Sequence, residues 1–321
     1  MKSLLLGIAL AAVTNIAGTT AQPYPTRPVT LIVPFAAGGP ADITGRMAAD
    51  IFSRALGQQF VVENVVGAGG TTGVTRAARA TPDGYTLTLG HMGTHAAAIA
   101  QYPNLAYKPV EDFEPISLVA DYPMVVSIRK DLPVNTLREF IAYAKANEAK
   151  LNMAHAGIGS VSHTGCLLFN AAIGIKPTLV PFTGTAPAMN ALIAGQVDYV
   201  CDPISGQLAH VRAGTVKAPV IAARKRHPAL PDVPTSAEGG LPDYIAAPFY
   251  GIFAPKGTPQ PVIERLAEAL KVGLDDEAVR KRMIDLGADV PEKEQRGPAG
   301  LAAMVKSEIA RLTPILEAAK K

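Results

Sequence analysis

The sequence has no tryptophan, and aromatic residues of all kinds make up only 6% of its 321 residues. A carbohydrate site built on stacked indole rings is therefore not expected. Cysteine is also scarce, with only Cys166 and Cys201 present. An oxidising compartment would permit a bridge between them, but we favour two buried free thiols because a domain of this size does not need a disulfide.

An excess of one charge is missing too. The formal net charge is +3, and Lys and Arg form no long run; their densest cluster is Arg224, Lys225 and Arg226. A nucleic-acid-binding surface needs a basic stripe, so no nucleic-acid partner is expected. Beyond the N-terminus, no segment reaches the roughly 20 continuous apolar residues that span a bilayer.

The first residues of the chain, 1–21, have the features of a signal peptide. Lys2 supplies a positive charge, residues 3–13 are mostly apolar, and Thr20 and Ala21 are small residues suited to cleavage before Gln22. The alternative is a buried N-terminal helix. No cysteine stands directly after the predicted cleavage point, so no lipid anchor is expected there. We predict an exported, periplasmic protein.

The hydrophobic content, 48% of the chain, is ample for large cores. At about 150 residues per domain, the length predicts two domains. Strand and helix signals alternate along the mature chain, as they do in parallel α/β sheets. Strands are predicted at 29–33, 60–63, 85–89, 178–181, 197–201, 220–223 and 250–254, with two more between 113 and 129. The longer predicted helices, the first with Asp42 as its N-cap, are 42–56, 137–149, 161–173, 189–194, 262–274, 277–286 and 298–321.

These elements predict two lobes. The chain leaves the first sheet near residue 122 and returns near 247, which gives a discontinuous lobe 1, residues 22–122 plus 247–321, and an inserted lobe 2, residues 123–246. Two mixed, mainly parallel sheets joined by two crossing strands would form a hinge with a cleft between the lobes. Ligands of such sheets bind outside the carboxyl ends of the strands.

Four predicted strand-to-helix loops are rich in Gly, Ser or Thr: 35–42, 67–73, 157–163 and 182–185. Each should present backbone N–H groups at the positive end of a helix, and glycine lets that backbone approach a ligand closely. Several such loops facing one cleft would bind an anion without Arg or Lys. Glycine that merely makes tight turns is the alternative, but four loops together favour a shared site.

The motifs of enzymes are incomplete. Gly67 and Gly69 resemble the start of a dinucleotide fingerprint, but Thr72 stands where the third glycine is required, so no cofactor is predicted. His91 and His95 have helical spacing without a Glu between them, so we predict polar loop residues that touch the solute and no metal site.

A secreted serine hydrolase is the alternative function. Ser160 and Ser162 lie beside His163, which combines a hydroxyl with an imidazole. However, neither serine stands in the Gly-x-Ser-x-Gly elbow of such enzymes.

Motifs along nearly the whole mature chain resemble the Bug family, the periplasmic receptors of tripartite tricarboxylate transporters. They occur in family order, at 24–29 (YPTRPV), 33–42 (VPFAAGGPAD), 63–64 (EN), 67–70 (GAGG), 82–87 (PDGYTL), 181–184 (PFTG), 195–198 (GQVD) and 253–259 (FAPKGTP). The resemblance implies a type II periplasmic binding fold and membrane components of the transporter as partners. It also implies that the first two glycine loops and residues 160–164 hold the solute carboxylate, partly through ordered water.

The chain departs from the family pattern at some of these positions. Thr71 replaces an Asn that is common in the family. Residues 90–95 form the family's variable loop, so the resemblance does not specify the chemistry of the distal end of the solute. Asp202, just past a predicted strand, would repel a second carboxylate and accept from an ammonium or hydroxyl group. A helix cap or a purely structural acid is the alternative for Asp202.

We therefore predict a monomeric receptor, not an enzyme, that captures a small organic acid by hinge closure. The expected solute is a dicarboxylate, aromatic ones included. A sensor subunit would share this fold. The predicted ligand-binding residues are Phe35, Ala37, Gly38, Gly39, Asp42, Gly70, Thr71, Thr72, His91, Thr94, Ser160, His163, Thr164, Phe182, Thr185 and Asp202.

Overall fold

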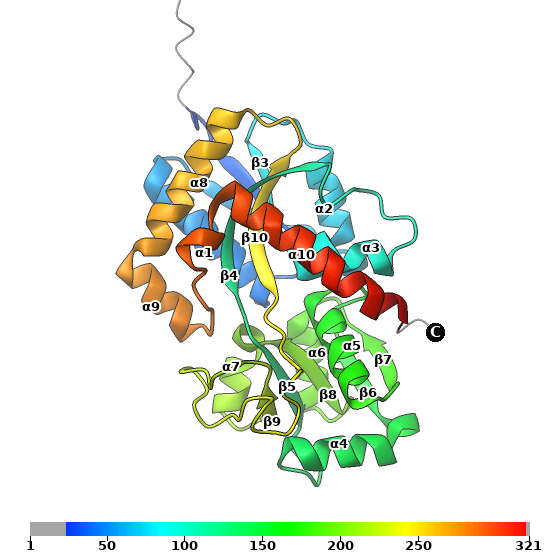
Figure 1. Ribbon diagram of the computed structural model, residues 1–321. Helices are drawn as coiled ribbons and strands as arrows, with labels where there is room; N and C mark the ends of the chain where they lie inside the picture. The colour runs from blue at the N-terminus through cyan, green and yellow to red at the C-terminus, as the bar shows by residue number, and fades with distance from the viewer. Residues whose placement is uncertain (1–23, 319–321) are drawn as a thin grey trace, which may run out of the picture.

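The computed structural model describes residues 24–318, so the predicted signal peptide lies outside the described residues. Within that range the strands form two mixed sheets, stacked one above the other in Figure 1 and each flanked by helices. The first sheet has the order β2-β1-β3-β10-β4 and the second β7-β6-β8-β5-β9. The strands are β1 (Val29–Val33), β2 (Phe60–Asn64), β3 (Thr86–His91), β4 (Phe113–Asp121), β5 (Met124–Arg129), β6 (Asn152–His155), β7 (Thr178–Pro181), β8 (Tyr199–Pro203), β9 (Val216–Ile221) and β10 (Phe249–Pro255).

Helices follow most of the strands, as the alternating pattern predicts. Those of the first lobe are α1 (Pro40–Leu56), α2 (Thr71–Ala78), α3 (Ala98–Gln101), α8 (Gln260–Asp275), α9 (Glu277–Asp285) and α10 (Gly297–Ala318). Those of the second lobe are α4 (Leu137–Ala146), α5 (Val161–Ile173), α6 (Thr185–Ile193) and α7 (Ile204–Arg212). None of the helices in residues 24–318 is long and apolar enough to cross a bilayer.

The two sheets share one plan. In each, two neighbouring pairs of strands are parallel and two are antiparallel, the latter involving β10 in the first sheet and β5 in the second. Each of these two strands enters its sheet directly from the other lobe. The two connecting segments are hydrogen-bonded to each other, from Tyr122 N–H to Pro248 O (3.3 Å) and from Met124 N–H to Ala246 O (2.9 Å). The predicted two-lobed α/β fold is confirmed.

Local sequence explains where the elements begin and end. β1 is apolar and buried except at Thr30, because helices cover both faces of its sheet. α1 begins with Pro40 in its first turn and ends at Gly57, which has a left-handed φ of 70° and donates its N–H to Ser53 O. The predicted N-cap was wrong, because Gly39 occupies that position and Asp42 lies in the first turn.

Four other differences from the sequence-based expectations concern α7, α6, His91 and Asp202. α7 was not predicted, because its sequence has a weak apolar pattern and no capping side chain before it. α6 begins at Thr185, four residues before the predicted helix, since small residues fill its first turn. His91 is the last residue of β3 and not part of a loop, and Asp202 lies within β8 and not past it.

The expectation of two free thiols was also wrong. Cys166 of α5 and Cys201 of β8 form a disulfide, with their Cα atoms 5.0 Å apart, and the sulfur of Cys166 accepts a hydrogen bond from the N–H of Cys201. Both residues are fully buried. The bridge therefore fixes a helix and a strand of the second lobe against each other.

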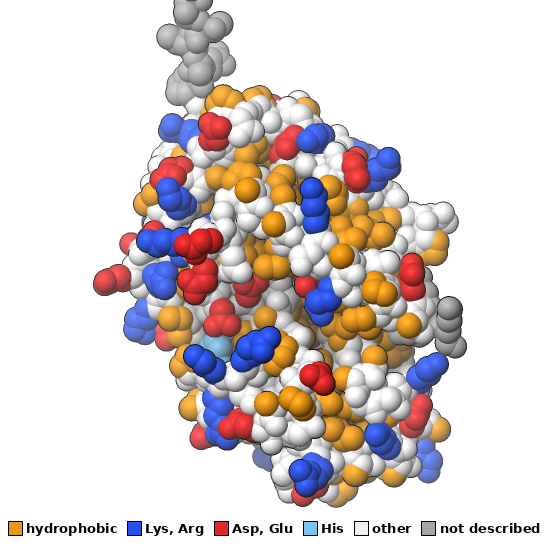
Figure 2. All heavy atoms as spheres, viewed as in Figure 1, with side chains coloured by type: hydrophobic (Ala, Val, Ile, Leu, Met, Phe, Trp, Pro, Cys, Tyr) orange, Lys and Arg blue, Asp and Glu red, His pale blue; other side chains and the backbone are white. Residues whose placement is uncertain are grey.

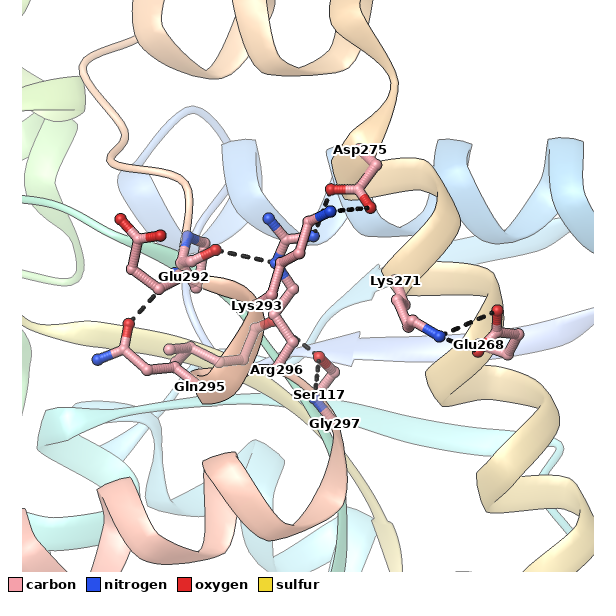
Figure 3. A network of polar contacts seen from close by, with 11 residues as sticks. Ser117, Glu268, Lys271, Asp275, Glu292, Lys293, Gln295, Arg296 and Gly297 are labelled. Atoms are coloured by element: carbon pink, nitrogen blue, oxygen red, sulfur yellow. Dashed lines mark hydrogen bonds and ion pairs between the residues drawn. The ribbon is translucent and has the colours of Figure 1, made fainter.

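The start of α10 is fixed by a polar network around Arg296 (Figure 3). The Arg296 side chain is 4% exposed, forms an ion pair with Asp275 at 2.8 Å and donates to Pro291 O at 2.9 Å. The N–H of Gly297 donates to Ser117 Oγ of β4 at 3.0 Å. From this anchor α10 runs across the first lobe toward α5 of the second lobe (Figure 1). On that face Lys and Arg lie scattered among Asp and Glu (Figure 2).

Candidate functional site

The lobes meet around a small cleft, the central cavity, with about 320 Å³ of empty volume. Its walls come from both lobes and are formed by Phe35, Ala36, Gly39, Pro40, Ala41, His91, Ala156, Ser160, Val161, Ser162, Thr185, Asp202 and Tyr250. None of these residues is Lys or Arg. The cavity lies outside the carboxyl ends of β1, β3, β6 and β8, where α/β sheets bind their ligands.

Three helices begin at the central cavity. α1 contributes Gly39 to Ala41, α5 contributes Ser160 to Ser162, and α6 contributes Thr185. Asp202 stands two residues before α7, whose first N–H, that of Ile204, donates to Pro123 O at 3.0 Å. The first N–H groups of a helix have no intrahelical acceptor, and the helix dipole places about half a positive charge there. These helix ends favour a small anion in the cavity without the help of a cationic side chain.

Asp42 stabilises the loop that leads into α1. Its carboxylate accepts from the N–H of Gly38 (3.0 Å), Nε of Arg46 (2.9 Å) and Nδ2 of Asn64 (2.9 Å). Burial would raise the pKa of Asp42, but these donors outweigh it and lower the pKa. Asp42 therefore holds the loop 35–39 as a buried, fully paired carboxylate.

The start of α5 is held by two serines. Ser160 is the N-cap and accepts from the N–H of His163 (3.1 Å), while its Oγ lies 3.1 Å from Oγ of Ser162. Ser162 Oγ also accepts from the N–H of Ala156 at 2.8 Å. Both hydroxyls line the cavity and are almost fully buried. Their remaining hydrogen-bonding capacity faces the space where a solute would lie.

His91 supplies a neutral N–H donor. Its Nδ1 accepts from the N–H groups of Gly93 (3.0 Å) and Thr94 (3.2 Å), so the ring proton resides on Nε2. Burial lowers the pKa of His91 to about 3, which keeps the imidazole uncharged at neutral pH. The ring packs between Phe35, at a centroid distance of 5.0 Å, and Tyr250, at 5.4 Å.

Asp202 is the one acidic side chain in the cavity wall. It is 2% exposed, and in the described part of the chain its Oδ2 has no hydrogen-bond partner. Burial raises the pKa of Asp202 to about 7, although a hydrogen bond with the Thr185 side chain acts in the opposite direction. Burial and the nearby Asp202 also raise the pKa of Tyr250, whose hydroxyl stays neutral.

A wider groove of about 730 Å³, the outer groove, opens beside the central cavity and shares Phe35 and Ala156 with it. Residues 66–70 and Tyr102 form one side, and residues 157–158 and 181–183 form the other. The two sides touch: an added Cβ on Gly69 would lie 1.6 Å from Ile158 O.

Other contacts also join the two lobes near the cavity. Nε2 of Gln101 in lobe 1 lies 3.3 Å from Nδ1 of His163 and 3.3 Å from Oγ1 of Thr164 in lobe 2. The Tyr102 hydroxyl is within hydrogen-bonding distance of Ile158 O. Contacts of this kind can form only when the lobes are close together, so the structure describes a closed arrangement.

The predicted site residues divide into three groups. Residues that line the central cavity are Phe35, Gly39, His91, Ser160, Thr185 and Asp202. Gly70 and Phe182 line the outer groove. The others, which line neither space, are Ala37, Gly38, Asp42, Thr71, Thr72, Thr94, His163 and Thr164.

The third group makes contacts within the protein or with solvent. Ala37, Gly38 and Thr72 are exposed on the outer surface. The Thr71 hydroxyl donates to Ala68 O at 2.9 Å, and Thr94 is fully buried with its hydroxyl 3.0 Å from Nδ1 of His95. A role for these residues in binding stays a prediction.

The sequence reasoning missed several wall residues, chiefly small ones at helix starts, together with Tyr250. Tyr250 lies in the predicted crossing strand, but only the antiparallel register of β10 with β3 places it opposite His91. No sequence pattern reveals that register. His95, predicted to touch the solute, is instead fully buried, and its ring stacks on Phe253 with centroids 4.0 Å apart.

The serines and His163 do not form a nucleophile–base pair. Nδ1 of His163 lies 3.3 Å from the N–H of Gly159 and 3.3 Å from Gln101, and Ser160 Oγ accepts from the backbone of His163 and not from its ring. Burial lowers the pKa of His163 to about 3, which makes it a poor general base. Within residues 24–318, no group of three or more His, Cys, Asp or Glu side chains could hold a metal ion.

Comparison with known proteins places these features in a family. Residues 44–320 match the family model described as tripartite tricarboxylate transporter family receptor. A solved structure of MatC from Rhodopseudomonas palustris with bound malate is 48% identical, with a TM-score of 0.88 over 92% of this chain and 100% of that one.

Two further structures are similar. The periplasmic binding protein BugD is 42% identical, with a TM-score of 0.87 over 92% of this chain and 99% of that one. An R. palustris protein with adipate is 32% identical, with a TM-score of 0.87 over 92% of this chain and 98% of that one.

Proposed function

The chain belongs to the family of tripartite tricarboxylate transporter receptors, to which the Bug proteins also belong, and from that premise we propose that it captures a small dicarboxylate in the periplasm for such a transporter. The observation that carries the proposal is the meeting of three helix N-termini, those of α1, α5 and α6, at one cavity without a cationic side chain. Such a cavity stabilises a carboxylate through backbone N–H groups and helix dipoles.

The ligands of the neighbouring structures narrow the solute. The central cavity of this closed arrangement is small. The MatC structure holds malate and the other R. palustris structure holds adipate. We therefore place four-carbon dicarboxylates first, with longer or aromatic diacids extending toward the outer groove past Phe35.

Closure of the lobes is part of the proposed function. We place lobe 1 at residues 22–122 plus 247–321 and lobe 2 at 123–246, with the hinge at the paired connecting segments. The cavity wall includes residues of both lobes, so a solute would bind the closed form better than the open one, and only such a difference in affinity can shift the equilibrium. The receptor is proposed to work as a monomer that delivers the solute to membrane components of the transporter.

A thermal-shift screen tests this function. The panel consists of malate, succinate, adipate, phthalate, citrate, aspartate and glutamate, with acetate and glucose as negative controls. A solute at a hundredfold excess over its dissociation constant stabilises the native state by about 2.7 kcal/mol, which raises the melting temperature by a few degrees. Calorimetry should confirm the binding of any diacid that shifts the melting temperature. If no diacid both shifts the melting temperature and binds in calorimetry, the proposed solute class is wrong.

Ser160→Ala tests the role of the α5 start. Loss of an N-cap lowers the free energy of unfolding by about 1 kcal/mol, and loss of a hydrogen bond to the solute should weaken malate binding by about 0.5–1.5 kcal/mol, or roughly two- to twelvefold. Thr136→Ala is the matched control, because Thr136 caps α4 far from the cavity. It should cost similar stability and leave the affinity measured by calorimetry unchanged. Equal affinities of Ser160→Ala and the wild type would exclude the contact.

A further inference from the structure

Asp202 is not explained by a role in anion binding. Its side chain forms part of the wall of a cavity otherwise built to attract a carboxylate, and its Oδ2 has no partner among the described residues. A buried polar atom without a partner is costly and is seldom kept without a use. Thr185 is the side chain that hydrogen-bonds to Asp202, and no Lys or Arg lines the cavity.

The ionisable groups around Asp202 leave its charge uncompensated. Within the cavity these groups are His91, whose ring is neutral, and Tyr250. α6, which carries Thr185, has no ionisable side chain. The ionisable residues of the other neighbouring elements, which do not line the cavity, are Asp42, Arg46, Asp50 and Arg54 of α1, Arg129 of β5, His155 of β6, Tyr199 of β8 itself, His163 of α5, and His210 and Arg212 of α7. Burial lowers the pKa of His155, which keeps its ring neutral.

The cations among those groups are engaged elsewhere or distant along their elements. Arg46 pairs with Asp42 at 2.9 Å. Arg129 pairs with Asp198 at 2.9 Å, at the opposite end of β5 from the residue that faces Asp202. His210 and Arg212 lie in the last turn of α7, whereas Asp202 precedes its first turn. No cation is therefore available to neutralise both Asp202 and a solute dianion.

Building on the proposed function, we propose that the receptor takes up one proton from the solvent with its dicarboxylate, and that this proton lies between Oδ2 of Asp202 and one carboxyl group of the solute. A protonated Asp202 is a donor, whereas an ionised Asp202 would repel the same carboxylate at hydrogen-bonding distance. The helix N-termini hold the other carboxylate. The site thus selects a diacid plus a proton, and not an amino acid whose ammonium group would need an ionised Asp202.

Burial favours the protonated form of Asp202 before the solute binds, since it raises the pKa of Asp202 to about 7. A raised pKa means that the folded protein binds more protons than the unfolded chain between the ordinary pKa of 3.8 and about 7. Stability should therefore decline as the pH rises through that window, and the empty receptor should be partly deprotonated at neutral pH. A solute carboxylate next to Asp202 would raise this pKa further.

Calorimetry of malate binding tests the proposal directly. At about pH 8 both malate carboxyl groups are ionised. If one proton is taken up from the buffer, the binding enthalpies measured in phosphate and in Tris should differ by about the difference between the ionisation enthalpies of these two buffers. The affinity for malate and for succinate should fall about tenfold per pH unit above pH 7. Neither effect should be seen at about pH 5.5 to 6, where Asp202 already carries its proton.

Asp202→Asn mimics the protonated side chain, because its amide can donate to a carboxylate. This variant should bind malate within about threefold of the wild type at pH 6 and should lose both the proton uptake and the pH dependence. Asp121→Asn is the matched control: burial also raises the pKa of Asp121 to about 7, but Asp121 does not line the cavity. It should alter the pH dependence of the melting temperature and leave the proton uptake on binding intact.

The outcomes separate the two proposals. Wild-type binding without proton uptake, or loss of binding in Asp202→Asn, would mean that Asp202 acts as an ionised acceptor and would overturn the proton-coupled capture. If malate and succinate do not bind at any pH, the proposed solute class fails. In that case the melting temperatures of the empty wild type and of empty Asp202→Asn still show whether Asp202 is protonated in the folded protein. The difference between them should change between pH 4 and pH 8, and a constant difference would refute the buried proton.

Discussion

A Gly69→Ala variant should lose about a hundredfold or more in affinity for its dicarboxylate while both lobes stay folded. Gly69 has a φ of 61°, and a Cβ there would lie 1.6 Å from the carbonyl oxygen of Ile158 and 2.7 Å from the Tyr102 hydroxyl. Non-bonded atoms do not approach so closely, so the loop 67–70 and the loop that carries Ile158 must move apart. These loops belong to different lobes, and the added methyl group therefore acts as a wedge against closure.

The size of the expected loss in affinity follows from how much the added methyl group lowers the population of the closed form. A solute held by both lobes binds the closed form, and a variant that populates it a hundredfold less binds about 2.7 kcal/mol more weakly. Calorimetry with malate measures the affinity. At a malate concentration that saturates the wild type but leaves Gly69→Ala mostly empty, small-angle scattering should show a smaller radius of gyration for the wild type and little change for the variant.

Gly195→Ala is the matched control for backbone strain. Gly195 has a similar φ of 71°, but an added Cβ there meets no atom within 4 Å. Its melting temperature should fall because a left-handed alanine costs about 1–2 kcal/mol, and its affinity for malate should not change. Wild-type affinity in Gly69→Ala would show that the loop yields without opening the lobes, and closure would then not depend on this contact.

The glycine-rich loops could be recognised from the sequence because their function imposes a local pattern. A helix start that approaches a ligand needs small residues in a short segment, and this pattern is visible at residues 35–39 and 157–160 without knowledge of the fold. The alternation of strands and helices is local in the same way. Both rest on interactions between residues close in the chain, which a single sequence records.

The rest of the site depends on contacts between distant segments. Tyr250 reaches the cavity only through the pairing of β10 with β3, about 160 residues apart in sequence. α7 has a weak apolar pattern, so the sequence does not show that Asp202 stands before a helix. The role of Asp42 in holding the loop 35–39 could not be predicted for the same reason, since its partner Asn64 comes from the next strand. Sequence reasoning therefore found the loops but not which side chains face the solute.

The disulfide lies directly behind the site. Cys166 is in α5, whose first residues Ser160 and Ser162 line the cavity, and Cys201 precedes Asp202 in β8. The bond therefore links two segments that must keep a fixed distance for the cavity to hold its shape. It also closes a loop of 35 residues in the unfolded chain, which by the loop-entropy relation is equivalent to about 4 kcal/mol.

Replacing both residues, Cys166→Ala with Cys201→Ala, should lower the free energy of unfolding of the second lobe by about 4 kcal/mol. For a lobe of this size that corresponds to a fall of roughly 10–15 °C in its melting temperature. Because each lobe has its own sheet, the variant should unfold in two calorimetric transitions, the earlier one from the second lobe. Malate affinity should fall as well, since α5 and β8 would no longer be held together.

Reductant separates the bond from the packing of the sulfur atoms. Because the bridge is fully buried, the wild type is reduced with a phosphine in denaturant and then refolded. Its melting temperature should fall almost to that of the double variant, whereas the same treatment should leave the double variant unchanged. The residual difference measures the loss of two buried sulfur atoms, about 1 kcal/mol or less each by methylene equivalence. If oxidised and reduced wild type melt together, the two cysteines stabilise the lobe only as packed thiols, and the cavity owes its shape to the core around α5 and β8 alone.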